Sequence, residues 1–174
     1  MDRPSRRRVL ATTGAALAAG LAGCTGDGGD GGGDDGGDGG DGGSQLEVSS
    51  EAQSRVESYL TADPAADNYD SITTMGGMSS ATVDVGAEGN GGNFAFAPAA
   101  LAVETGTTVN WEWMAGSHNV KAAEDSDFDL DSGSAEQDGS YEFTFDEAGV
   151  ANYYCTPHQG VGMKGSVVAV ASGN

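Results

Sequence analysis

The sequence is poor in cysteine and in basic residues, and each shortage excludes a class of protein. Among 174 residues there are only two cysteines, Cys24 and Cys155, and they lie in different segments, so no disulfide framework holds the chain. Seven lysines and arginines stand against 27 aspartates and glutamates, which gives a net charge of −20. A chain this acidic is not expected to bind nucleic acid or to lie directly on an anionic membrane. The excess of acid instead favours a basic partner, a very salty solvent that screens the repulsion, or both.

The sequence also lacks a long hydrophobic run, and its apolar amino-terminal segment indicates export rather than a membrane span. The stretch "SRRRVLATTGAALAAGLAGC" joins three arginines to an apolar part that is shorter than the roughly 20 residues of a spanning helix. The arginine pair followed by Val and Leu resembles a twin-arginine (Tat) signal. "LAGC" resembles a lipobox, in which Cys24 becomes the lipidated first residue of the mature protein. We therefore predict a Tat-type lipoprotein signal peptide at 1–23 and a lipid anchor on Cys24, with an uncleaved anchor or an ordinary signal peptide as the alternative.

A low-complexity linker follows the signal. Residues 27–43 are only aspartate and glycine, a composition that cannot bury apolar surface. We therefore predict that 24–48 form a disordered, self-repelling tether behind the lipidated cysteine. About 30 such residues would reach on the order of 30 Å, which would hold a domain near a membrane and leave it free to reorient.

Residues 49–80 are predicted to form a short helix and a loop that lead into the domain. The pattern "SSEAQSRVESYL" offers Ser49 or Ser50 as an N-cap and places Val56, Tyr59 and Leu60 on one helix face. The following "TADPAADNYDSITTMGGM" has no hydrophobic period and indicates a loop.

From Ala81 onward the hydrophobic period changes to two, which indicates strands. "TTVNWEWM" alternates Val109, Trp111 and Trp113 with polar residues, and "YEFTFDEAG" alternates three aromatic residues in the same way. Turn signals such as "AEGNGGN", "DSGS" and "QDGS" separate the short runs. We therefore predict an all-β domain over 81–172, a β-sandwich of seven or eight strands. An unrelated all-β barrel would show the same pattern and stays open at this point.

The few metal-binding side chains of this domain share one pattern. "YYCTPHQGVGM" holds Cys155, His158 and Met163, and the glycines after the histidine allow the loop to curl back towards the cysteine. The only other histidine, His118, lies in "AGSHNV" at the predicted start of another strand. Taken singly, each of these residues has an ordinary structural role. Together, one thiol, two imidazoles and one thioether favour copper, and a His2Cys site with a weak axial methionine is a blue-copper electron-transfer centre.

These motifs resemble two related families of copper proteins. "YYCTPHQGVGM" is similar to the copper loop of plastocyanins. "VGAEGNGGNFAFAPAALAVETGTTVNWEWMAGSHNV" is similar to the first half of the domain in halocyanins, the membrane-attached members from halophilic archaea. The resemblance runs from about Thr82 to Val170 and implies a Greek-key cupredoxin sandwich that binds one copper ion as Cu(I) or Cu(II).

The resemblance also implies roles for individual residues. Asn119 matches the position whose backbone N–H and side chain brace the thiolate and the ligand loops, and Pro157 lies beside the ligands in the Cys-x-Pro-His motif. Four residues would be the copper ligands: His118, Cys155, His158 and Met163.

We therefore predict a membrane-tethered blue copper protein that carries single electrons between redox proteins at the membrane. We expect a monomer that is not an enzyme, on the extracytoplasmic face of the cell membrane of a halophile. Three alternatives fit the sequence less well. A copper oxidase or nitrite reductase subunit needs a further histidine-rich copper site, and a hydrolase with a Cys155–His pair leaves Met163 unexplained. A copper storage or delivery protein would favour Met-rich or multi-Cys sites.

Overall fold

The computed structural model describes residues 46–173 of the chain. The predicted signal peptide, Cys24 and the Asp/Gly run at 27–43 lie outside these residues, so they stay predictions. No helix in the described part is long and apolar enough to cross a membrane.

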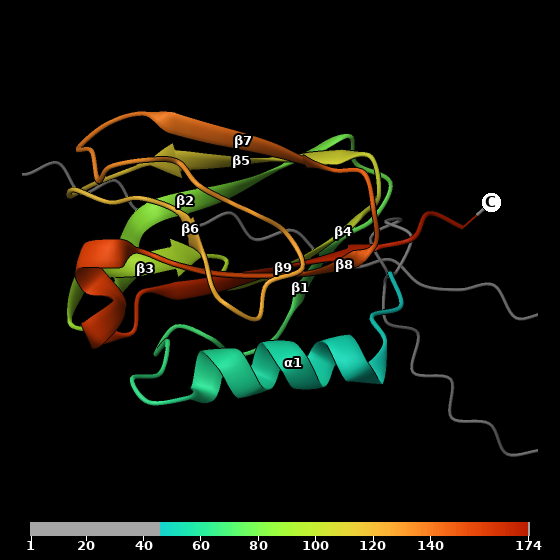
Figure 1. Ribbon diagram of the computed structural model, residues 1–174, viewed down its shortest axis with the longest axis horizontal. Helices are drawn as coiled ribbons and strands as arrows, with labels where there is room; N and C mark the ends of the chain where they lie inside the picture. Colours follow the sequence, from blue (N-terminus) through green and yellow to red (C-terminus); the bar gives the residue numbers. More distant parts are fainter. Residues whose placement is uncertain (1–45, 174) are drawn as a thin grey trace, which may run out of the picture. The chain divides into compact units, whose positions relative to one another are not determined.

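Nine strands in the described residues form two β-sheets that face each other as a sandwich (Figure 1). The strands are β1 (Thr73–Met75), β2 (Ser80–Gly89), β3 (Gly92–Ala97), β4 (Ala100–Glu104), β5 (Thr107–Trp113), β6 (Lys121–Ala122), β7 (Ser140–Phe145), β8 (Gly149–Tyr154) and β9 (Lys164–Val170). One sheet has the order β1-β4-β9-β8-β6 and the other the order β3-β2-β5-β7. The predicted all-β sandwich is confirmed, and two separate sheets exclude a single closed barrel.

The strands β8 and β9 hold the predicted metal-binding loop between them. They pair antiparallel along the whole of β8, from Gly149 opposite Ala169 to Tyr154 opposite Lys164. The short 3-10 helix η1 (Thr156–Val161) connects them and ends at Gly162, whose φ of 92° lies in the left-handed region that favours glycine. The N–H of Cys155 donates to the carbonyl of Met163 at 3.0 Å, so the two ends of the loop lie side by side.

The core between the sheets is aromatic near this loop. Phe96, Trp111 and Tyr153 are fully buried, and the rings of Trp111 and Tyr153 meet edge to face at 5.5 Å between centroids. Cys155 and Met163 belong to the same buried cluster. The loop therefore rests on the packed end of the core, where close packing limits its movement.

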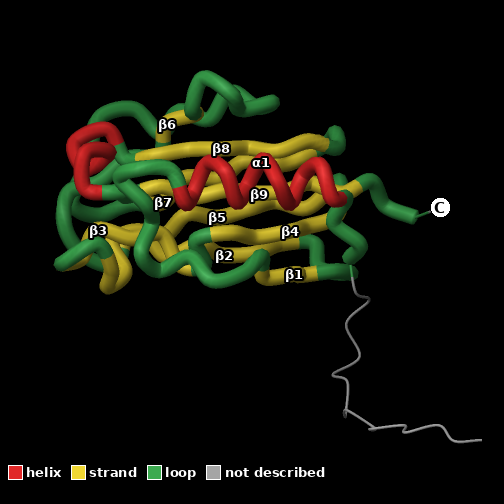
Figure 2. The backbone as a smooth tube through the Cα atoms, turned by 90° about the horizontal axis from the view of Figure 1, so that it is seen from below, coloured by secondary structure: helices red, strands yellow, loops and turns green. Residues whose placement is uncertain are grey.

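A helix adds a third layer. The helix α1 (Ser50–Thr61) covers the outer face of the five-stranded sheet (Figure 2). The side chain of Ser49 accepts a hydrogen bond from the N–H of Ala52 at 3.2 Å, so the predicted helix and its cap are confirmed. Val56 and Leu60 are fully buried in an apolar cluster with residues of β4, β8 and β9.

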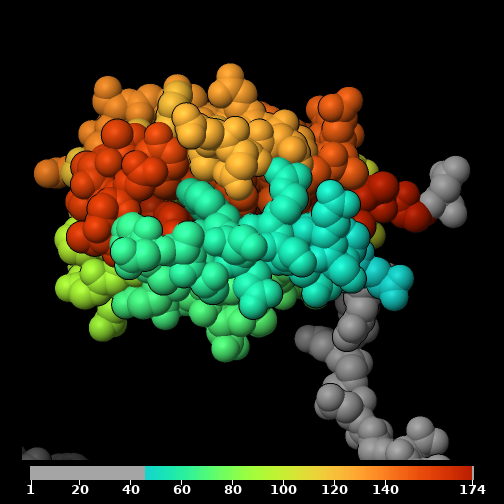
Figure 3. Space-filling view, turned by 60° about the horizontal axis from the view of Figure 1, so that its bottom comes forward, coloured from blue at the N-terminus to red at the C-terminus, as the bar shows by residue number. Residues whose placement is uncertain are grey.

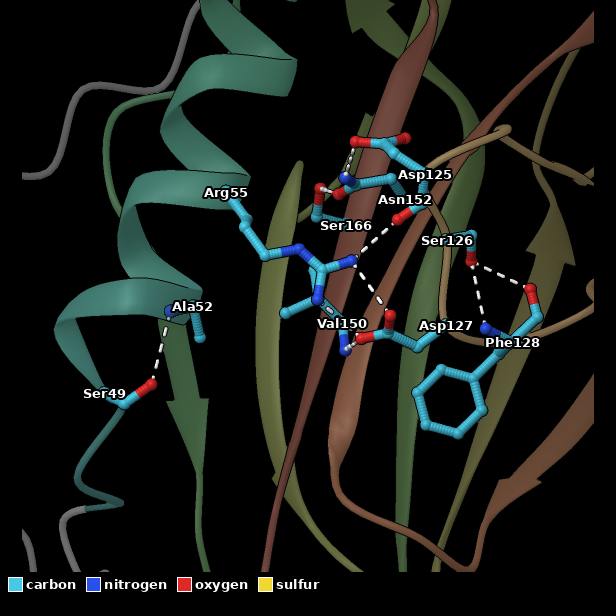
Figure 4. A network of polar contacts seen from close by, with 10 residues as sticks. All are labelled: Ser49, Ala52, Arg55, Asp125, Ser126, Asp127, Phe128, Val150, Asn152 and Ser166. Carbon is cyan, nitrogen blue, oxygen red and sulfur yellow. Dashed lines mark hydrogen bonds and ion pairs between the residues drawn. The ribbon is translucent and has the colours of Figure 1, made fainter.

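A polar network ties the middle of α1 to the sandwich (Figure 4). The guanidinium of Arg55 donates to the carboxylate of Asp127 at 2.6 and 3.1 Å and to the carbonyl of Asp125 at 2.6 Å. The same carboxylate accepts the N–H of Val150, in β8, at 2.8 Å. Arg55 holds the pKa of Asp127 below its usual value, which favours the charged form of this pair.

The structure differs locally from the sequence prediction at two places. Residues 73–75, in the segment predicted as a loop, form β1 and pair in parallel with β4. His118 makes an isolated bridge to Glu136, and the next strand, β6, begins only at Lys121. Both β1 and β6 have three residues or fewer, too few to show an alternation in the sequence.

Acidic residues on this domain far outnumber the bases that could offset them. Residues 46–173 carry 20 acidic and three basic residues, a net charge of −17. The ion pairs of this described part are Arg55–Asp127 and Lys121–Asp131, each at 2.6 Å. Most carboxylates therefore have no cation beside them and repel one another unless salt screens them.

We expect the thermal midpoint of the protein to fall when salt is lowered from molar to about 10 mM, because the Debye length grows from about 3 Å to about 30 Å. A drop on the order of 5 °C or more corresponds to about 1 kcal/mol in a domain of this size. Unfolding would be followed by circular dichroism. The triple variant E112Q/E142Q/E147Q, at exposed positions, should reduce the dependence. Equal midpoints at both salt concentrations would contradict the prediction.

Candidate metal centre

Three metal-binding atoms from two loops meet at one end of the sandwich. Cys155 follows β8, His158 lies in η1, and His118 lies between β5 and β6. The Sγ of Cys155 lies 3.3 Å from Nδ1 of His158 and 3.6 Å from Nδ1 of His118. The two Nδ1 atoms are 3.1 Å apart. The fold thus brings together a histidine and a cysteine that are 37 residues apart in the chain.

The spacing of these three atoms fits one metal ion. A point equidistant from atoms separated by 3.1, 3.3 and 3.6 Å lies about 1.9 Å from each, near the roughly 2.0 Å of a metal–nitrogen bond. Two imidazoles and a thiolate suit copper. Within residues 46–173, no other group of three His, Cys, Asp or Glu side chains is arranged to hold a metal.

The backbone around His118 fixes the direction of its ring. Its N–H and carbonyl bond to Glu136 at 2.9 and 3.0 Å, and the indole N–H of Trp113 donates to the same carbonyl at 2.8 Å. The Nε2 side of the ring lies against Gly116, where a Cβ would collide with it. Glycine at 116 therefore leaves the room in which the ring turns its Nδ1 towards Cys155.

Burial shifts the pKa values of His118 and Cys155, two of the three residues in this group. Burial lowers the pKa of His118, the nearby His158 ring lowers it further, and two backbone carbonyls oppose the shift. Burial raises the pKa of the Cys155 thiol, and backbone hydrogen bonds from Asn119 and His158 oppose the shift. At neutral pH the imidazole of His118 is therefore neutral and able to bind a metal, whereas the thiol must lose its proton when a metal binds.

Met163, the predicted fourth ligand, is held next to this triad by its backbone. Its carbonyl accepts the N–H of Cys155, and its own N–H donates to the carbonyl of His158 at 3.2 Å. Its side chain is fully buried in the same core cluster as Cys155. The loop therefore returns the methionine to the neighbourhood of the thiol, and the thioether as a ligand stays a prediction.

Asn119 joins the two loops that carry the triad. Its side-chain oxygen accepts the N–H of Thr156 at 2.8 Å. Its amide group donates to the hydroxyl of Thr156 at 3.1 Å and to the carbonyl of Gly133 at 2.9 Å. Because Asn119 follows His118 and Thr156 follows Cys155, these bonds tie one ligand to another through their chain neighbours.

Sequence reasoning missed Phe94, which comes from β3 in the opposite sheet. Its ring lies 4.6 Å from that of His158 and 6.5 Å from that of His118, between centroids. With Pro157 and both histidines it lines a surface cavity of about 360 Å³. The alternation in "NFAFA" indicates a strand, but it does not say which of its aromatic rings reaches the metal-binding loop.

The four candidate ligands differ in their access to solvent. His118, Cys155 and Met163 are fully buried, whereas His158 is half-buried. Pro157 and Val161, on either side of His158 in η1, are exposed. The imidazole of His158 is therefore the only one of the four side chains that reaches the surface.

A β-sandwich with a buried His2Cys group at one end is the arrangement expected of a small copper protein. Residues 81–170 match the family model of copper binding proteins, plastocyanin/azurin family. The chain is 43% identical over 119 residues to halocyanin of Natronomonas pharaonis, a match that covers 67% of this chain and 72% of the relative. It is 38% identical over 98 residues to plastocyanin of Scenedesmus fuscus, covering 49% of this chain and 95% of that protein.

A solved structure of a mutant fern plastocyanin matches 52% of this chain and all of that chain, at 24% identity and a TM-score of 0.44. The family match over 81–170 spans more than half of the chain. The chain therefore belongs to the plastocyanin/azurin family of copper-binding proteins. Copper is its cofactor, and the predicted family, fold class and cofactor are confirmed.

We expect the purified protein to bind one copper ion and to be intensely blue when oxidised, because a thiolate in a His2Cys site is a ligand of blue copper. Cys155→Ser should abolish the colour and reduce copper retention at least tenfold. Cys24→Ser, at the only other cysteine, is the matched control and should keep both. Visible absorption and metal analysis would decide, and a Cys155→Ser protein that stays blue would place the thiolate elsewhere.

Proposed function

We propose that the protein carries single electrons between redox partners. The observation that carries this proposal is the convergence of three donor atoms at metal-binding separations within a hydrogen-bonded surrounding. Copper, when bound, supplies a one-electron couple between Cu(I) and Cu(II). Because packing and hydrogen bonds hold the ligands, the protein would reorganise little when the charge changes.

The half-buried ring of His158 is the proposed contact for a partner. The other three candidate ligands are fully buried, so a partner that touches Pro157 and Val161 would come closest to the metal through this imidazole. Phe94 packs against the same ring and lines the surface cavity together with it. Exposed apolar residues beside the ring favour brief, weakly specific contact, which suits a carrier that must leave its partner.

A carrier fits the residues better than an enzyme does. Both histidines of the chain lie in the one His2Cys group. A copper oxidase or nitrite reductase subunit needs a second copper site rich in histidine, which this chain alone cannot build. A copper delivery protein would need exchangeable ligands, whereas His118 and Cys155 are fully buried.

We further propose that the domain works at a membrane, as a monomer held by a lipid on Cys24 after Tat export. The lipobox-like "LAGC" and the aspartate–glycine linker support this proposal. The net charge of −17 on residues 46–173 supports a salty medium, as in the surroundings of a halophile. The proposed partners are redox proteins of the same membrane.

Met163→Gln should keep the copper and the colour but lower the reduction potential. A thioether is a soft donor that favours Cu(I), whereas an amide oxygen is hard and favours Cu(II). Voltammetry of the wild-type protein should give one reversible one-electron wave, and the wave of the variant should lie at a lower potential. Met78→Gln, at an exposed methionine, is the control and should not change it. An irreversible wild-type wave would contradict the carrier proposal, and an unchanged potential in Met163→Gln would exclude Met163 as a ligand.

Cys24→Ala should release the protein from the membrane fraction of its host without changing the spectrum of the copper site. Removal of the residue proposed to carry the lipid would remove the anchor, and the candidate site is built from residues far along the chain. Fractionation after a high-salt wash, with immunodetection, would measure the release. Variant protein that still sediments with membranes would refute lipidation as the anchor.

A further inference from the structure

The carboxyl-terminal end of α1 is bonded directly to the residue that follows Met163. Lys164 is 6% exposed, and its Nζ donates to the carbonyls of Tyr59 at 2.8 Å and Ala62 at 2.9 Å. The same Nζ lies 5.2 Å from the centroid of the Tyr59 ring. Carbonyls at the end of a helix lack partners within the helix, so Lys164 supplies the donors that this helix end needs.

The same turn of α1 also contacts the strand that precedes Cys155. The hydroxyl of Tyr59 donates to the carbonyl of Tyr153 at 2.9 Å, in β8. Tyr59 therefore touches both sides of the ligand loop, at Tyr153 before it and at Lys164 after it. A shift of the last helical turn would move both strands at the point where the loop begins and ends.

The loop after α1 packs on the ligand loop as well. The carbonyl of Ala65 lies so close to Gly162 that a Cβ there would collide with it. The side chain of Asn90 donates to the carbonyl of Gly162 at 3.1 Å and accepts the N–H of Asp67 at 3.0 Å. Figure 3 shows the segment after α1 lying against the red η1 region.

The two cations that fix α1 act at different places. Arg55 binds Asp125 and Asp127, in the segment between β6 and β7, and this network contains no ligand of the metal (Figure 4). Lys164 binds the carboxyl-terminal end of the helix and is the chain neighbour of Met163. The first contact fixes the helix to the sandwich, and the second connects it to the ligand loop.

We propose that the carboxyl-terminal turn of α1 positions the copper ligands, and that Lys164 and Tyr59 are the positioning residues through which it acts. Neither is one of the four candidate ligands. The helix lies outside the family match, which begins at residue 81, so this part of the chain adds a constraint to the ligand loop of the shared fold. The inference rests on the proposed binding of copper by this loop, and not on the carrier role or on a partner.

Lys164→Met tests the proposal, because it removes the donors and keeps a long apolar side chain. In the metal-free protein, amide hydrogen exchange at Cys155 and Met163 should become at least about tenfold faster, while exchange in β5 stays unchanged. In the copper-loaded protein, the visible bands should shift in relative intensity, and copper should pass to a chelator at least about tenfold faster. Tyr59→Phe, which removes one hydroxyl, should act in the same direction at Cys155 and keeps the proposal testable if Lys164→Met fails to fold.

Arg55→Met is the matched control, since it removes the other cation that joins α1 to the sandwich. It should lower the thermal midpoint without changing the visible spectrum or the exchange at Cys155 and Met163.

Wild-type exchange and spectrum in both Lys164→Met and Tyr59→Phe would overturn the proposal. So would faster exchange throughout the sandwich in Lys164→Met and Arg55→Met alike, because Lys164 would then act on global stability only. A wild-type protein without blue colour would instead refute copper binding by the loop, and exchange in the metal-free variants would still decide the role of the helix.

Discussion

The antiparallel pairing of β8 with β9 is the constraint on which the metal-binding end of the molecule depends. Its last bond, from the N–H of Cys155 to the carbonyl of Met163, closes the loop that holds His158. In a sheet the side-chain period is two, so a slip of one residue would turn Cys155 from the core towards the opposite face. Burial of Tyr153 and of the strand after the loop opposes such a slip. The geometry of the site therefore depends first on the register of the β8–β9 pairing, and only then on the ligand side chains.

Each of the three basic residues in the described part of the chain makes a structural contact, in a domain where acidic residues are in large excess. Arg55, in the middle of α1, binds Asp127 of the sandwich, and Lys164, in β9, binds the carboxyl-terminal end of α1. Lys121 pairs with Asp131. Exposed ion pairs contribute little on average, but Lys164 is buried and satisfies backbone carbonyls that would otherwise lack donors. Two of the three cations of the described residues therefore lie where the helix meets the sandwich.

The sequence predicts the sandwich and the candidate ligand loop because both depend on local patterns. Alternation in "TTVNWEWM" identifies β5, and the spacing from Cys155 to Met163 identifies the loop. What the sequence does not predict depends on contacts between distant segments. The stacking of Phe94 on His158 crosses from one sheet to the other, and the bonds of Lys164 join residues 102 and 105 positions apart. β1 is missed for a different reason, since three residues are too few to show a period.

The complete burial of Cys155 has a consequence for the chemical lifetime of the metal-free chain. An exposed free thiol is open to oxidation by peroxide, to mixed disulfides and to a disulfide with a second copy of the same protein. Here the sulfur is sealed beneath the loop and has a raised pKa, so both its exposure and its reactive thiolate fraction are low. Oxidation of this thiol therefore requires the loop to open first. An empty molecule can therefore persist until copper reaches it, and the rigidity of the loop sets how long.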